Sequence, residues 1–287
     1  EGQDALLLPE LAREAATRGL VYVCRDDSHL ATLADQLDYF APKFDVIRFP
    51  AWDCLPYDRV SPSADILARR LATLARLEKP SGQPFIVLTT VNAVLQRVLP
   101  KTLIAKATFL AKPGMRFGLD ALQIFLTDNG YSRVGTVVEQ GDFAVRGGLI
   151  DLYPPGADAP VRLDFFGDTL ETIRSFDPQS QRSTDQLKEL RLNLANEVLL
   201  NANSIAGFRT AYAQAFGGID LNDPLYESIT SGRRYQGMEH WLPLFQSELE
   251  TLFDYLPDAI WWLGPEVPAS MTARHEQIAE YYDARKE

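Results

Sequence analysis

The chain has few of the side chains that build metal centres and catalytic dyads, because its 287 residues include only two cysteines and three histidines. Cys24 and Cys54 do not have the spacing of metal ligands, and Cys24 lies in the apolar run 20–24, where a buried small side chain is expected. The histidines, which have no second ligand at metal-binding spacing, are His29, His240 and His275. No zinc-protease, nucleophile-elbow or paired-cysteine motif occurs. The sequence therefore predicts neither a metal site nor a catalytic residue.

Positive charge and long apolar runs are also scarce. The formal net charge is −11, and phosphate contacts come from lysine and arginine, so nucleic acid is a poor default partner. No run approaches the roughly 20 apolar residues that span a bilayer, and no signal peptide is visible, so a cytoplasmic location is expected. The chain begins without Met and ends in a polar helical pattern at residues 271–287. We therefore expect a fragment of a longer protein.

A phosphate-binding loop is missing as well. Such a loop needs glycines that point backbone N–H groups at phosphate, a lysine for the terminal phosphates, and a serine or threonine for magnesium. Nowhere does Gly-Lys precede serine or threonine. The nearest slot, residues 1–4, offers Glu1 and Asp4 before the first predicted helix, where they would repel phosphate. No nucleotide or other cofactor is expected.

What the sequence does contain is a change of pattern along the chain. Residues 1–112 alternate helix and strand patterns, which is typical of a parallel sheet. Strands are predicted at residues 20–24, 45–49 and 85–89. Helices are predicted at residues 4–17, 28–40, 63–77 and 91–98. We interpret this stretch as an α/β domain.

The pattern of residues 113–196 predicts an inserted α+β domain. One helix is predicted at residues 119–129, and it is followed by short strands separated by turn residues, which favours an antiparallel sheet. The strands are predicted at residues 135–139, 148–153, 161–166, 171–176 and 189–194. Residues 197–287 return to helices, at 203–215 and 224–231. A further strand at 259–263 is expected to rejoin the first sheet, which would make the first domain discontinuous.

Three arginines of the insert, Arg146, Arg162 and Arg174, are the candidate binding residues. Strict alternation in residues 161–166 places Arg162, Asp164 and Phe166 on one face of a strand. An exposed aromatic ring beside arginines is typical of protein-binding hot spots. The alternative is a solvated sheet face with one weak Arg–Asp pair, and periodicity alone favours that alternative.

Several segments together resemble the bacterial transcription-repair coupling factor family, Mfd. They are residues 49–58 (Phe-Pro-Ala-Trp-Asp-Cys-Leu-Pro-Tyr-Asp), residues 61–71 with their Ser-Pro start, residues 146–154 (Arg-Gly-Gly-Leu-Ile-Asp-Leu-Tyr-Pro), residues 162–166 (Arg-Leu-Asp-Phe-Phe) and residues 237–245 (Gly-Met-Glu-His-Trp-Leu-Pro-Leu-Phe). They keep the order that the family has and extend over nearly the whole chain. The resemblance implies the N-terminal module that is similar to the repair protein UvrB, with residues 1–112 as domain 1a, 113–196 as domain 2 and 197–287 as domain 1b. It implies a degenerate helicase-like parallel sheet with domain 2 inserted.

The resemblance also implies partners. Domain 2 of the family binds UvrA, and the positions that match the family's contacts are Arg146, Arg162 and Phe166, with Asp164 and Arg174 as possible flanking contacts. It implies RNA polymerase and DNA only as partners of other domains. We expect charge reversal at Arg162 to abolish UvrA binding while leaving the fold intact.

No enzyme activity is expected for this chain, although the full-length parent is expected to be an ATP-dependent DNA translocase. UvrB has an acidic pair after the strand that matches residues 259–263, whereas Gly264 and Pro265 stand there in this chain. UvrB also has a long DNA-clamping hairpin where residues 50–62 form a short connection.

Two alternatives stay open. The same face is expected to be masked by the C-terminal domain of the full-length protein, in which case this module is an autoinhibitory clamp. Less favoured is an active ATPase or DNA-translocase fragment, which would bind nucleotide and show steep salt dependence on DNA.

Overall fold

The computed structural model describes residues 2–286. It divides into two compact units, one formed by residues 1–58, 73–101 and 249–287 and the other by residues 59–72 and 102–248. In the described part of the chain, no helix is long and apolar enough to cross a membrane. The domain borders inferred from sequence, at residues 112 and 196, stay predictions.

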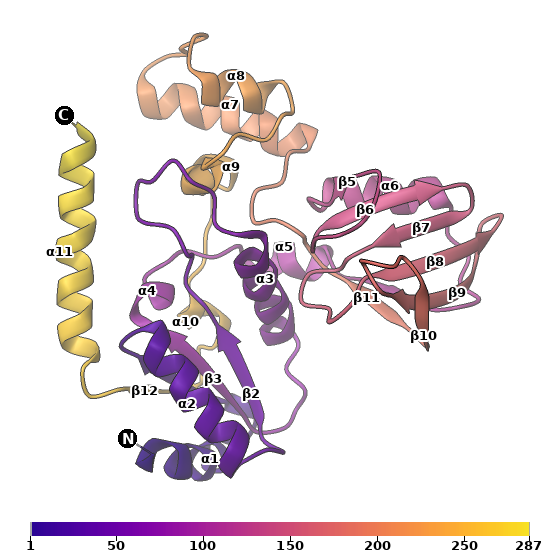
Figure 1. Cartoon of the computed structure of the whole chain (residues 1–287). Coiled ribbons are helices and arrows are strands. Elements are labelled where there is room, and N and C mark those ends of the chain that lie inside the picture. The colour runs from indigo at the N-terminus through magenta and orange to yellow at the C-terminus, as the bar shows by residue number, and fades with distance from the viewer. Residues whose placement is uncertain (1, 287) are drawn as a thin grey trace. The chain divides into compact units, whose positions relative to one another are not determined.

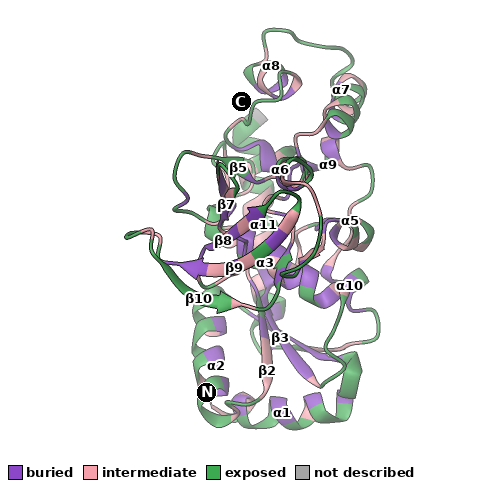
Figure 2. Ribbon diagram, turned by 90° about the vertical axis from the view of Figure 1, so that its right-hand side faces the viewer, coloured by how far each residue is buried: buried purple, intermediate pink, exposed green. Residues whose placement is uncertain are grey.

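The first unit contains a four-stranded parallel sheet (Figure 1). Its strands, in the order β12-β1-β3-β2, are β12 (Ile260–Leu263), β1 (Leu20–Cys24), β3 (Phe85–Thr90) and β2 (Asp45–Phe49). β1 and β3 are buried along their whole length (Figure 2) because helices cover both faces, which explains their unbroken apolar sequences. The prediction that residues 259–263 rejoin the first sheet is confirmed, since β12 pairs in parallel with β1.

Helices cover both faces of this sheet. Leucines and alanines of α1 (Gln3–Ala15) and α2 (Asp27–Phe40) share one core with Leu20 and Tyr22. On the other face, α4 (Val91–Val94) and the start of α11 (Val267–Lys286) pack with Val23 and Trp261. The remaining helices of the unit are the part of α3 (Ala64–Glu78) from Thr73 onward and α10 (Leu252–Tyr255). Residues 50–63 contain no helix or strand.

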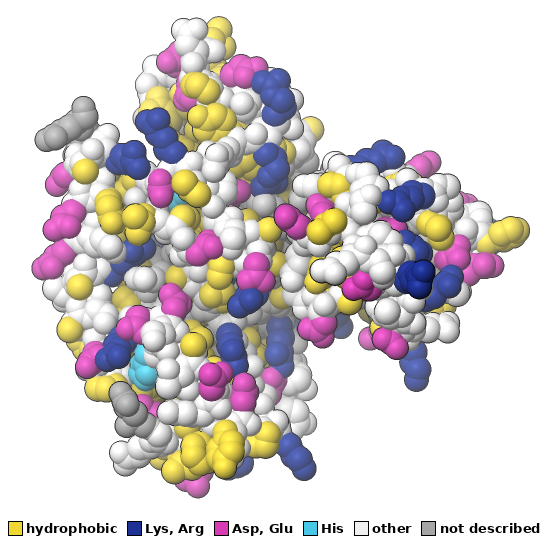
Figure 3. All heavy atoms as spheres, in the orientation of Figure 1, with side chains coloured by type: hydrophobic (Ala, Val, Ile, Leu, Met, Phe, Trp, Pro, Cys, Tyr) yellow, Lys and Arg dark blue, Asp and Glu magenta, His cyan; other side chains and the backbone are white. Residues whose placement is uncertain are grey.

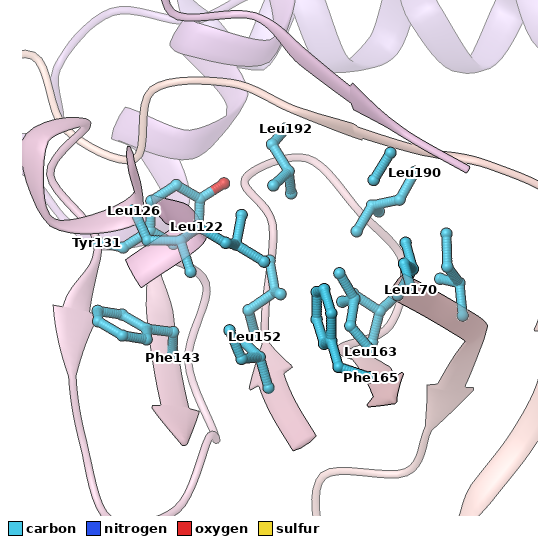
Figure 4. Close-up of a cluster of buried hydrophobic side chains, with 14 residues drawn as sticks. Leu122, Leu126, Tyr131, Phe143, Leu152, Leu163, Phe165, Leu170, Leu190 and Leu192 are labelled. Atoms are coloured by element: carbon cyan, nitrogen blue, oxygen red, sulfur yellow. The ribbon is translucent and has the colours of Figure 1, made fainter. Parts of the chain in front are cut away.

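The second unit contains a six-stranded sheet in the order β10-β9-β8-β7-β6-β5, antiparallel except where β5 pairs with β6. Its strands are β5 (Ser132–Arg133), β6 (Asp142–Arg146), β7 (Leu149–Leu152), β8 (Val161–Phe166), β9 (Thr169–Phe176) and β10 (Ser183–Leu187). Helix α6 (Leu119–Asp128) packs Leu122 and Leu126 onto one face, and Figure 4 shows the resulting core. β4 (Phe109–Ala111) and β11 (Leu190–Leu192) form a separate two-stranded sheet.

The second unit also holds a group of short helices. They are α5 (Lys101–Lys106), α7 (Ala202–Phe216), α8 (Pro224–Thr230) and α9 (Leu242–Phe245). Arg70 in the first half of α3 forms a buried ion pair with Glu197, and both belong to this unit. The structure therefore confirms a mixed α/β fold with one parallel sheet and a separate, mainly antiparallel sheet.

Some predicted elements are wrong. Residues 135–139 form no strand, because they lie in a loop whose Val137 packs on Ala144 and Phe176. The extended stretch predicted at 189–194 is confirmed in part, as β11 (Leu190–Leu192), which pairs with β4. The predicted helix at 91–98 ends at Val94, since Val98 forms a bridge to Glu250.

Candidate functional site

The five predicted binding residues lie on one face of the six-stranded sheet, opposite the core that α6 covers. The pairing of the strands shows this. Arg146 is opposite Leu149, which in turn is opposite Asp164. Arg162 lies two residues before Asp164 on β8 and is opposite Arg174. Residues opposite one another in a sheet share a face. We call this surface the outer face and define it by Arg146, Asp151, Arg162, Asp164, Phe166 and Arg174. Figure 3 shows basic and acidic side chains interspersed over this part of the molecule.

The alternation in β8 positions the central residues of the outer face. Val161, Leu163 and Phe165 are buried, whereas the intervening side chains are half-buried or exposed. The apolar set joins the core under α6, and this fixes the register because a one-residue shift would turn the apolar set to solvent. The face predicted for Arg162, Asp164 and Phe166 is confirmed.

Arg162 is held by a carboxylate of the neighbouring strand. Its Nε donates to Asp151 Oδ1 at 2.6 Å and its Nη2 donates to Asp151 Oδ2 at 2.8 Å. The guanidinium also lies over the ring of Phe176, 5.0 Å from the centroid. The hydrogen bonds from Arg162 to Asp151 raise the pKa of the guanidinium, against the opposing effect of burial. Arg162 is therefore a fixed, permanently charged donor.

This pairing corrects the expectation that charge reversal at Arg162 leaves the fold intact. The side chain of Asp151 is only 3% exposed. A carboxylate at position 162 would stand beside the buried Asp151 with no cation between them, which destabilises the sheet. Arg162→Lys keeps a cation beside Asp151, whereas a neutral substitution leaves that carboxylate unpaired, so the binding of either variant has to be measured together with its unfolding.

Arg174 and Asp164 form a second pair on the outer face. Arg174 Nη2 donates to Asp164 Oδ2 at 3.2 Å, and Arg174 Nε donates to Thr172 Oγ1 at 3.3 Å. Both charged side chains are more than a third exposed. A pair in such surroundings contributes little to stability, so it is a polar border of the face.

Arg146 ends β6 at the rim of the outer face and ties down a neighbouring loop. Its Nη2 donates to the Gly135 carbonyl at 2.8 Å and to Thr136 Oγ1 at 3.3 Å. The turn that follows needs glycine twice: Gly147 has φ +62°, and a Cβ on Gly148 would lie 2.8 Å from the Phe165 carbonyl oxygen. The Arg-Gly-Gly motif therefore allows β6 and β7 to turn tightly against β8.

Phe166 is the exposed apolar group of the outer face. Its relative exposure is 79%, whereas the neighbouring Phe165 is 7% exposed in the core. A ring left in water next to charged side chains gains free energy when a partner covers it. The geometry suits protein binding better than chemistry.

Two residues of this site were missed from the sequence. Asp151 and Phe176 fix Arg162, but neither is near it in the chain. The available signal was a carboxylate inside the apolar run Leu149–Leu152, which implies a buried charge that needs a cation. Identifying that cation as Arg162 required the strand register.

The slot predicted at residues 1–4 lies at the start of α1 in the first unit. Of the predicted slot, Glu1 lies outside the described residues. Asp4 at the start of α1 accepts a hydrogen bond from Tyr22 Oη at 2.7 Å, and burial together with Asp4 raises the pKa of Tyr22. Arg25 forms an ion pair with Glu266. Both basic and phenolic groups near the slot are thus paired with carboxylates of this chain.

The cavity that remains there is small. Its volume is about 190 Å³, below the roughly 300–1,000 Å³ of typical ligand pockets. It is lined by Asp4, Arg25, His29, Gly264, Pro265 and Glu266. A Cβ on Gly264 would lie 3.1 Å from the Val23 carbonyl oxygen, so a larger residue there needs the neighbours to move. In the described part of the chain, no group of three or more His, Cys, Asp or Glu side chains is placed to hold a metal ion.

The profile of the UvrB interaction domain matches residues 110–197, which contain the whole outer face. The chain is 35% identical over 288 residues, 99% of its length, to the transcription-repair-coupling factor of Haemophilus influenzae. This chain belongs to the transcription-repair-coupling-factor family.

Other members of the family match nearly as much of the chain. The factor of Escherichia coli K12 is 35% identical over 89% of this chain, and that of Myxococcus xanthus is 39% identical over 87%. The matches cover 25%, 22% and 21% of the three relatives. The chain thus spans about a quarter of the length of the curated family members that it matches.

Proposed function

We propose that this chain is a non-catalytic adaptor that docks UvrA through the outer face and so recruits it to stalled RNA polymerase in transcription-coupled nucleotide excision repair. The observation that carries the proposal is the placement of Arg146, Arg162 and Phe166 on one sheet face within the matched domain. RNA polymerase and DNA would be bound by parts of the longer protein that this chain does not include.

We also propose that the first sheet belongs to a helicase-like domain that has lost its nucleotide site. The parallel sheet would be a degenerate helicase-like domain built from residues 1–112 and 197–287, and residues 113–196 would be the UvrA-binding insert. Support comes from the parallel pairing of β12 with β1 and from the carboxylate-lined slot beside Gly264. Such a domain would retain its shape without nucleotide chemistry.

The test is a binding assay between purified UvrA and the chain with Arg146→Ala and Arg162→Ala made one at a time. Each is expected to weaken binding by about fivefold or more, which corresponds to about 1 kcal/mol of binding free energy or more. Arg209→Ala is the control, because Arg209 is exposed in α7, outside the six-stranded sheet, and donates to the Thr230 carbonyl. Unchanged affinity in both outer-face variants would remove the proposal.

A second role is favoured by the exposure of Phe166. A ring that is 79% exposed benefits from a cover when UvrA is absent. We infer that the C-terminal domain of the full-length protein supplies it, as an autoinhibitory clamp. Deleting that domain should raise the affinity of the full-length protein for UvrA, and unchanged affinity would contradict the clamp.

A further inference from the structure

Asp151 is the buried carboxylate of the outer face, and solvent scarcely reaches its side chain. Its side chain is 3% exposed, whereas that of Arg162 is 18% exposed. A partner protein that covers the outer face would therefore touch Arg162 and Phe166 but scarcely Asp151. Any effect of Asp151 on docking would have to pass through Arg162.

The hydrogen bonds decide which edge of Arg162 is left for a partner. Nε and Nη2 both donate to Asp151, and the ring of Phe176 lies against one face of the guanidinium. In the part of the chain that the structure describes, Nη1 makes no hydrogen bond. The guanidinium is thus fixed with its Nη1 edge free, four residues along β8 from Phe166 and on the same face, with Asp164 between them.

From this arrangement we propose that Asp151 is a positioning residue for docking, which holds Arg162 so that a partner binds a fixed N–H edge on the same sheet face as Phe166. The proposal rests on the proposed UvrA-binding function. It also specifies the chemistry of the partner: an apolar socket for Phe166 and, about 13 Å away along β8, a hydrogen-bond acceptor for Nη1. Fixing the side chain beforehand saves the entropy that a free arginine loses on binding.

The net charge of the face separates this proposal from simple attraction. The three arginines and two aspartates of the outer face leave one net positive charge, and Asp151→Asn raises it by one. If an acidic surface of UvrA recognised charge alone, Asp151→Asn would bind UvrA at least as tightly as the unmodified chain does. If UvrA recognises a fixed Arg162, the variant binds more weakly, because asparagine offers one acceptor where the carboxylate offers two.

The decisive experiment measures UvrA affinity for Asp151→Asn, Arg162→Ala and the double variant. We expect Asp151→Asn to weaken binding about tenfold, and to have no further effect when Arg162 is already alanine. Arg162→Lys keeps the charge but not the fork, so it should lose as much affinity as Asp151→Asn. Asp185→Asn is the matched control, because it removes an exposed carboxylate from β10 of the same sheet.

Several outcomes would overturn the proposal. They are unchanged or tighter binding by Asp151→Asn, a full effect of that change in the Arg162→Ala background, and normal binding by Arg162→Lys. Urea unfolding of each variant identifies losses that come from misfolding. The Nε–H signal of Arg162 in NMR spectra should shift in Asp151→Asn without UvrA present, so failure of UvrA binding as such is distinguished from failure of positioning.

Discussion

Arg70 and Glu197 form an ion pair whose side chains are 0% and 1% exposed, with Arg70 Nε 2.7 Å from Glu197 Oε1. Glu197→Gln removes the negative charge and leaves the arginine buried. We expect it to lower the free energy of unfolding by about 3–5 kcal/mol, the usual cost of breaking a buried pair. Urea unfolding measures this.

The exposed pair of Lys112 and Glu189 offers the comparison. Glu189→Gln makes the same chemical change on the surface and should leave the urea midpoint close to that of the unmodified chain. Similar shifts for both variants would show that burial of the Arg70 pair is not what matters.

Cys24 gives a prediction about pH. Its thiol is fully buried at the end of β1, and burial, with smaller contributions from nearby aspartates, raises its pKa from 9.0 to about 12. The folded state therefore keeps the proton that the unfolded state loses. Its contribution to stability is complete below pH 9 and falls as pH rises from 9 towards 12, by at most about 1.4 kcal/mol per pH unit.

Urea unfolding across this alkaline range checks the effect of Cys24. Cys24→Ala should make the fall shallower. Some fall should persist, because the pKa of Tyr22 is raised too. An equally steep fall in Cys24→Ala would contradict the assignment.

At the scale of elements, the turn between β6 and β7 should be sensitive to a single methyl group. Gly148→Ala would bring a Cβ to 2.8 Å from the Phe165 carbonyl oxygen, so β7 and β8 must separate beside the outer face. We expect a loss of about 1–3 kcal/mol in unfolding free energy, together with weaker UvrA binding. Gly207→Ala, inside α7 with open space around it, should be neutral or slightly stabilising.

Several strands, but not all of them, could be predicted from the sequence. The predicted bounds of β1, β2 and β8 are confirmed. β1 is an apolar run that is buried throughout, whereas β2 buries Ile47 and Phe49 and β8 alternates between buried and more exposed side chains. β10 was missed, since Ser183–Leu187 is polar and pairs with β9 at a sheet edge through its backbone. No side-chain pattern marks such a strand.

The candidate site could also be predicted only in part from the sequence. Period-two alternation places Arg162 and Phe166 on one face without any structure. The pairing of Arg162 with Asp151 depends on the register between β7 and β8, which joins residues 11 positions apart. That long-range contact fixes Arg162 on a carboxylate that the alternation within β8 does not identify.

For the molecule as a whole, we expect no nucleotide binding by this chain. The slot beside α1 has carboxylates from Asp4 and Glu266, and the guanidinium in its lining, that of Arg25, is already paired with Glu266. Titration with a fluorescent ATP analogue and magnesium should give no saturable signal at micromolar protein. Tight saturable binding would restore the ATPase alternative.

We propose that the outer face docks UvrA mainly through Phe166, its exposed aromatic side chain. The most direct test compares UvrA affinity for the unmodified chain, Phe166→Ala and Ile124→Ala by calorimetry. Ile124 is a matched control, because it is 62% exposed on α6, on the other side of the sheet. We predict a loss of tenfold or more for Phe166→Ala, about 1.4 kcal/mol at least, with no change in unfolding midpoint and no effect of Ile124→Ala. Equal affinity for all three chains would contradict the account.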